Sequence, residues 1–158
     1  MPSRRGWALA SLAIAPLAAG CLGGGSGSSG SASHQLTHAE YVAKAGAVCS
    51  SYRKRIAALP TPSDLQKLAD SGERAIELQR QEVAELRRLV PPAADAADVN
   101  RMLDAVERGI AAGEQLVAAA RTNDAPAVAA AAQSLQSALE PANRIARKLD
   151  LGACAITA

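Results

Sequence analysis

Residues 37–59, THAEYVAKAGAVCSSYRKRIAAL, decide the fold. Their large apolar side chains recur every three or four residues, which is the period of one face of an α-helix. Thr37 and Glu40 have the spacing of a capping box, in which each side chain bonds the backbone N–H of the other residue. Pro60 and Pro62 end the pattern because proline cannot continue a helix. The segment therefore predicts one helix with a buried stripe, made of Tyr41, Ala45, Val48, Cys49, Tyr52, Ile56 and Leu59.

Three further segments share this period, at about residues 63–90, 94–121 and 126–149. They are rich in Ala, Leu, Arg, Glu and Gln, which are good helix formers, and no alternating run indicates a strand. Four amphipathic helices joined by short turns predict an all-α fold, an antiparallel up-down four-helix bundle. Since alanine and glycine lie on the stripes and the chain has no Phe, we expect close packing with few large cavities.

Several residues predict where these helices begin, end or bend. Ser63 with Gln66 has the capping-box spacing, Asp124 or its neighbour Asn123 can cap the last helix, and Gly152 suits a helix C-terminus. Pro141 lies inside the last helix, where its ring removes one backbone hydrogen bond and clashes with the preceding turn. We therefore expect the fourth helix to be kinked or broken near Pro141. Acid–base pairs at helical spacing, such as Glu77–Arg80, Glu85–Arg88 and Asp104–Arg108, predict exposed pairs within helices.

The first 21 residues, MPSRRGWALASLAIAPLAAGC, have the three-part layout of an export signal. Arg4 and Arg5 give a positive start, the apolar run is shorter than the ~20 residues of a membrane span, and small residues precede Cys21. The closing LAAGC resembles the lipobox of bacterial lipoproteins, in which the chain is cut before the cysteine. The resemblance implies a signal peptide at 1–20, with diacylglycerol and acyl chains on Cys21 as the one attached group. The alternative is an ordinary signal cut elsewhere, with Cys21 a spare thiol.

Residues 21–36 then form a tether, and residues 37–158 form the bundle domain. Gly and Ser dominate the tether, so it offers nothing to bury and keeps the backbone flexible. An acylated Cys21 would hold the protein outside the cytoplasm, on the cell membrane or the outer membrane, because two or more chains anchor a protein stably.

Cys49 and Cys154 are the other two cysteines. In an oxidising compartment an even pair predicts a disulfide, which would join the first helix to the C-terminal segment. The alternative is a pair of reduced thiols in the core or a redox pair, although no Cys-x-x-Cys spacing is present to lower a thiol pKa.

Charge and composition exclude several classes of partner. The chain has 17 Lys and Arg against 15 Asp and Glu, and loss of Arg4 and Arg5 with the signal would balance the two. A neutral chain with 2% aromatic residues has neither the basic surface nor the stacking side chains typical of nucleic-acid binding. No motif for a phosphate loop, a dinucleotide turn or a nucleophile with its base is present, so we expect no enzyme activity.

His34 and His38, four residues apart, are the candidate metal ligands. Two histidines at this spacing can share an ion, but a zinc site usually has three or four protein ligands. Two solvated histidines at the start of a helix are the simpler interpretation.

The whole layout resembles small helical lipoproteins of unassigned function from actinobacteria, on the segments EYVAKAGAVC and LGAC. The resemblance implies a lipobox, a tether and an Ala-rich helical domain with two cysteines, and the family itself supplies no activity. We expect a membrane-anchored, non-enzymatic binding or scaffolding module whose partner is another envelope protein. Two alternatives remain open, a small-ligand-binding bundle with a pocket between helices and a weak metal-binding protein that uses His34 and His38.

Overall fold

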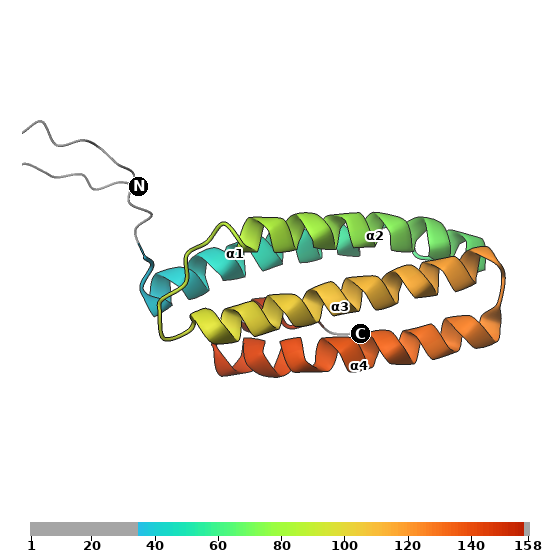
Figure 1. Ribbon diagram of the computed structural model, residues 1–158. Coiled ribbons are helices and arrows are strands. Elements are labelled where there is room, and N and C mark those ends of the chain that lie inside the picture. Colours follow the sequence, from blue (N-terminus) through green and yellow to red (C-terminus); the bar gives the residue numbers. More distant parts are fainter. Residues whose placement is uncertain (1–34, 157–158) are drawn as a thin grey trace, which may run out of the picture. The chain divides into compact units, whose positions relative to one another are not determined.

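The computed structural model describes residues 35–156, and this part of the chain is helical throughout its regular structure (Figure 1). The four long helices are α1 (His38–Ala57), α2 (Leu65–Leu86), α3 (Ala96–Arg121) and α4 (Ala125–Lys148), followed by a 3-10 turn, η1 (Gly152–Cys154). No strand occurs within the described residues. The all-α class is therefore confirmed, and the packing of the helices is compatible with a bundle.

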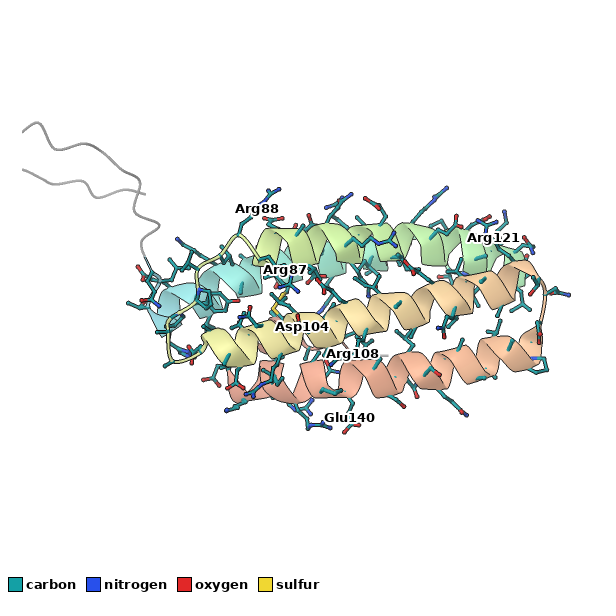
Figure 2. All side chains as sticks on the ribbon, viewed as in Figure 1. Arg87, Arg88, Asp104, Arg108, Arg121 and Glu140 are labelled. Atoms are coloured by element: carbon teal, nitrogen blue, oxygen red, sulfur yellow. A yellow bond between two sulfur atoms is a disulfide. The ribbon has the colours of Figure 1, made fainter. Side chains whose placement is uncertain are left out.

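The helix α3 lies between α2 and α4 and packs against both, whereas α1 packs against α2 and against η1 (Figure 1). A series of ion pairs links α2 to α3. As the residue number of the partner on the α2 side rises, the residue number of its partner on α3 falls. The series runs from Glu73–Arg121 through Arg80–Glu114 to Arg87 with Asp104 and Glu107. Figure 2 shows Arg87 and Asp104 close together between the two helices. These pairs join α3 to α2 or to the residue directly after α2, whereas the predicted pairs, such as Glu77–Arg80, lie within one helix.

The buried side chains form two clusters. One cluster joins α1, the end of α2, the first half of α3 and the end of α4, and its largest fully buried members are Tyr41, Leu103, Leu151 and Cys49. The other cluster lies between α2 and α3 and is built on Ala69, Ile76, Val83, Ile110, Val117 and Ala120. Of the predicted α1 stripe, Tyr41, Ala45, Cys49 and Tyr52 are buried and the other members are half-buried. Each Å² of apolar surface removed from water contributes ~25 cal/mol to the stability of the fold. Burial of these helix faces is therefore what stabilises the helices.

Side chains cap the N-termini of α1, α2 and α4, and one predicted cap is wrong. Thr37 and Glu40 form the predicted capping box at the start of α1. Asp124 accepts the N–H of Ala127 at the start of α4, as predicted. At α2 the cap is Asp64, whose carboxylate accepts the N–H of Lys67 at 2.8 Å, and Ser63 donates its hydroxyl to that carboxylate. The carboxylate is the stronger acceptor, so the cap lies one residue later than the Ser63 box, and the bond from Lys67 lowers the pKa of Asp64.

Two residues in the left-handed conformation end the last two helices. Asn123 has φ 56° and Asp150 has φ 58°. After α4 the N–H of Leu151 donates to the carbonyl of Ala146 at 2.8 Å, which is the long bond of a Schellman motif. The prediction that Gly152 ends this helix is therefore wrong, because Asp150 already occupies the left-handed position and Gly152 begins η1.

Pro141 lies within α4, which continues without interruption from Ala125 to Lys148. The break that the sequence predicted near Pro141 is therefore absent, and the kink stays a prediction.

Two glycines of α3 make a matched test of packing between helices. A Cβ on Gly109 would lie 2.9 Å from Cγ of Leu139 on α4, whereas a Cβ on Gly113 would meet Ile76 at 3.6 Å, an ordinary contact. We expect Gly109→Ala to lower the free energy of unfolding by about 1 kcal/mol, since an overpacking cost of about 1–3 kcal/mol exceeds the gain in helix propensity. Gly113→Ala should raise it by about 0.5–1 kcal/mol. Urea unfolding of both variants measures the difference, and equal effects at the two sites would contradict the packing argument.

Candidate functional site

The C-terminal segment Leu151–Ile156 is tied to two helices. Cys154 forms a disulfide with Cys49 of α1, with the Cα atoms 5.0 Å apart. The guanidinium of Arg53, one turn further along α1, donates to the carbonyl of Ala153 and, at 2.9 Å, to that of Ala155. On α4, Asn143 donates to the carbonyl of Ile156 at 2.9 Å and accepts its N–H at 2.7 Å. The segment therefore bridges α1 and α4, and the predicted disulfide is present.

This segment forms one wall of a cavity of about 150 Å³, which we call the narrow cavity. The cavity lies among α1, α2 and α3, and the disulfide is part of its lining. Its charged residues are Arg53 and Glu82, and Gln79 adds a neutral amide. The apolar part of the lining consists of Ile56, Val83, Leu86, Met102, Leu103 and Val106. A cavity of this volume with apolar walls is large enough for a molecule the size of benzene.

A second cavity of about 360 Å³, the wide cavity, lies among α2, α3 and α4. Its small residues are Gly72, Ala75 and Gly113; a Cβ would fit at Gly113, 3.6 Å from Ile76, but not at Gly72, where it would lie 2.7 Å from Val117. Gln79 and Ile156 line both cavities, so the two cavities adjoin at these residues. The expectation of few large cavities needs correction here, since the small residues that allow close packing elsewhere leave volume at this place. The apolar lining consists of Ile76, Leu116, Val117, Leu135, Leu139 and Ile156.

Glu82 lines the narrow cavity, and its surroundings shift the pKa of its carboxyl group. Its side chain is half-buried, and within residues 35–156 it has no hydrogen bond or ion pair. Burial disfavours the charged form and raises the pKa of Glu82 to about 7, while the positive charge of Arg53 acts in the opposite direction. The carboxyl group therefore changes charge near neutral pH.

Of the two candidate metal ligands, His38 is hydrogen-bonded to a carboxylate. His38 bonds the carboxylate of Asp95 at 2.7 Å through Nδ1, and its Nε2 lies 3.9 Å from Asp150. His34 lies outside the described residues. Within residues 35–156 no group of three or more His, Cys, Asp or Glu side chains is placed to hold a metal ion. His38 thus holds the start of α1 to Asp95, the residue directly before α3.

Tyr41 is buried beside this pair, with 1% of its surface exposed. Its hydroxyl has no hydrogen-bond partner among the described residues. Burial, with the charge of Asp95 as a smaller cause, raises the pKa of Tyr41 to about 12. The hydroxyl therefore stays protonated, and Tyr41 acts as a core side chain.

The basic residues near the helix ends are engaged within the bundle. Arg55 stacks over the ring of Tyr52, with 4.7 Å from its guanidinium carbon to the ring centroid. Lys148 pairs with Asp98 at 2.7 Å, and Arg144 pairs with Glu140. The bonds from Lys148 and Arg101 lower the pKa of Asp98. These pairs disperse the positive charge along the surface of the bundle.

Sequence reasoning missed Glu82 and Asn143, because both look like ordinary exposed positions of a helix. The sequence did contain one indication that Glu82 is partly buried, since it directly precedes the buried Val83 in the apolar stripe of α2. No such signal exists for Asn143, whose role depends on the path of a segment without regular structure.

Cys21 lies outside the described residues, as do the segments predicted to be a signal peptide and most of a tether. Among residues 35–156 no helix is both long and apolar enough to span a membrane.

No family model, curated protein or solved structure matches the chain.

Proposed function

We propose that the protein is a lipid-anchored binding module outside the cytoplasm that takes a small, largely apolar ligand into its helical bundle. The wide cavity is the observation that carries this proposal. Ligand cavities of about 300–1,000 Å³ are typically apolar with a few polar groups, and the wide cavity has this size and this lining. Of the interpretations that the sequence left open, it favours a small-ligand-binding bundle over a scaffold that binds another envelope protein.

We infer that the four helices form an antiparallel up-down bundle with the wide cavity between its last three helices. The ordered ion pairs between α2 and α3 support this topology. On the α3–α4 side, Asp98 near the start of α3 pairs with Lys148 at the end of α4. Gly109, further along α3, lies against Leu139, earlier in α4.

Binding, not catalysis, is proposed because of the chemistry of the lining. The polar side chains of the wide cavity are Gln79, Gln136, Asn143 and Glu140, and the last of these pairs with Arg144. Amides orient a ligand through hydrogen bonds, whereas a nucleophile with an adjacent base is the usual mark of covalent catalysis.

The experiment measures binding of the neutral fluorophore N-phenyl-1-naphthylamine to the full-length Cys21→Ser protein, which avoids detergent. We expect a dissociation constant between about 1 and 100 µM, the range that ligand efficiency allows for a ligand of this size. Ala75→Phe, which places a ring in the wide cavity, should weaken binding at least tenfold. Ala111→Phe adds the same ring on an exposed face of α3 and serves as the matched control. No binding by the parent protein, or equal binding by both variants, would overturn the proposal.

The anchor is tested separately in the native host with an alkyne-labelled fatty acid. The parent protein should take up the label and remain in the membrane fraction, because acyl chains contribute ~0.8 kcal/mol for each buried CH₂. Cys21→Ser should lose both properties, whereas Cys49→Ser should keep the label. Label retained by the Cys21→Ser variant would show that the lipid is attached elsewhere.

A further inference from the structure

We propose that the narrow cavity binds the protonated amine of an amphiphilic ligand, with the carboxylate of Glu82 as its counter-ion. This inference rests on the proposed function and names the chemical class of the ligand. The narrow cavity would take the charged head, and the adjoining wide cavity would take the apolar body.

Among residues 35–156, Glu82 has no hydrogen-bond or ion-pair partner. The other charged residue of the lining, Arg53, sends its guanidinium to the carbonyls of Ala153 and Ala155, and no ion pair within 4.0 Å joins it to Glu82 among the described residues. A buried carboxylate without a partner is costly, and a donor with a positive charge compensates it best. The raised pKa of Glu82 is consistent with a carboxyl group that the protein leaves unpaired.

The wall around Glu82 is mostly apolar. Apolar side chains and the disulfide form most of the wall of the narrow cavity, so a ligand there would be partly removed from water. An ion pair or charge-assisted hydrogen bond is stronger in such surroundings than in solution. A neutral ligand of the same shape would gain the burial but not the pairing, and an anion would be repelled by the carboxylate.

The narrow cavity adjoins the wide cavity. Gln79 and Ile156 line both cavities, and Asn143 holds Ile156 by two hydrogen bonds. A ligand with its amine at Glu82 can therefore extend past these residues toward α4. This arrangement selects for an apolar molecule with one cationic end.

The test uses three probes of nearly equal size, benzylammonium, benzyl alcohol and benzoate, with the full-length Cys21→Ser protein in calorimetry at pH 8. We expect benzylammonium to bind at least tenfold more tightly than benzyl alcohol, and benzoate to bind least. In Glu82→Gln the first two probes should bind within about twofold of each other. Glu85→Gln, a nearby exposed position on the same helix, is the matched control and should keep the tenfold preference.

The pH dependence gives a second readout. The charged groups of the lining are Glu82 itself and Arg53 from α1, and the amine of the probe stays protonated below pH 8. The preference for benzylammonium should therefore fall as the pH decreases below about 7, because Glu82 then takes up a proton. Binding of benzyl alcohol should stay constant.

The outcomes separate this inference from the proposed function. Equal binding of benzylammonium and benzyl alcohol by the parent protein, or preferred binding of benzoate through Arg53, would overturn the amine site and leave the wide cavity untouched. Binding of N-phenyl-1-naphthylamine depends on the wide cavity, so its loss would overturn the proposed function whatever the small probes do.

Discussion

Removal of the Cys49–Cys154 disulfide should lower the free energy of unfolding by about 3–4 kcal/mol. The bond closes a loop with a sequence separation of 105 residues, and the chain-entropy model gives ~4.7 kcal/mol as the upper figure for a loop of this length. The loop contains α2, α3 and α4, so the cross-link restricts nearly the whole unfolded domain. The measurement is urea unfolding of Cys49→Ser/Cys154→Ser against the oxidised parent protein.

The same change should loosen residues 153–156. Leu151 stays buried and bonded to Ala146, but without the disulfide the bonds that hold residues 153–156 to the helices are those from Arg53 and Asn143, which are exposed or half-buried and worth about 1 kcal/mol each. Hydrogen exchange at the amide of Ile156, whose N–H bonds Asn143, should accelerate in the double variant. We also expect the narrow cavity to open, because Ala153, Ala155 and Ile156 form part of its wall.

A single control separates loss of the cross-link from damage at the two positions. The reduced parent protein should be destabilised to the same extent as the double serine variant. If the oxidised and reduced forms differ by less than about 1 kcal/mol, the entropic argument fails. Alkylation of both thiols without a reductant would show that the bond is absent in the native protein.

The helices could be predicted from local sequence because their causes are local. Thr37 with Glu40 and Asp124 cap their helices through contacts three residues apart, and these predictions are confirmed. The predicted cap at Ser63 was wrong by one residue, because the neighbouring carboxylate of Asp64 accepts the backbone N–H of Lys67 instead. The helix end at Asp150 carries no such signal, since a non-glycine residue takes the left-handed conformation there.

The ion pairs show where local reasoning ends. Spacing predicted Glu77–Arg80 within α2, yet Arg80 pairs with Glu114 of α3. An arginine side chain can reach a facing helix as easily as the next turn of its own. The choice between the two depends on how the helices lie beside one another, which the period of a single helix does not contain.

The candidate site was still less accessible to sequence reasoning. The disulfide followed from the number of cysteines and the expected compartment, but the cavities depend on the volume that side chains from several helices leave unfilled. Gly72 and Gly113 illustrate the difficulty. A Cβ on Gly72 would come within 2.7 Å of Val117, whereas one on Gly113 would find ordinary contact distances, although both glycines lie on apolar stripes.

Glu82→Gln should stabilise the protein at pH 8 by about 2 kcal/mol and have little effect near pH 4. The folded protein raises the pKa of Glu82 from 4.5 to about 7 through burial, so between these values the folded state binds more protons than the unfolded state. Stability from this group is therefore present below pH 4.5 and is lost as the pH rises toward 7. A shift of this size corresponds to about 3 kcal/mol at most, and partial exposure of the side chain reduces it.

The measurement is the difference in free energy of unfolding between Glu82→Gln and the parent protein at several pH values from 4 to 8. Glutamine keeps the shape of the side chain and cannot ionise, so the difference isolates the cost of the buried charge. It should grow between pH 4.5 and 7 and then level off, while Glu85→Gln, exposed on the same helix, should stay within about 0.5 kcal/mol throughout. A constant difference at Glu82 would mean that its carboxyl group is hydrated in the folded protein. The unpaired charge on which recognition of an amine depends would then be missing from the narrow cavity.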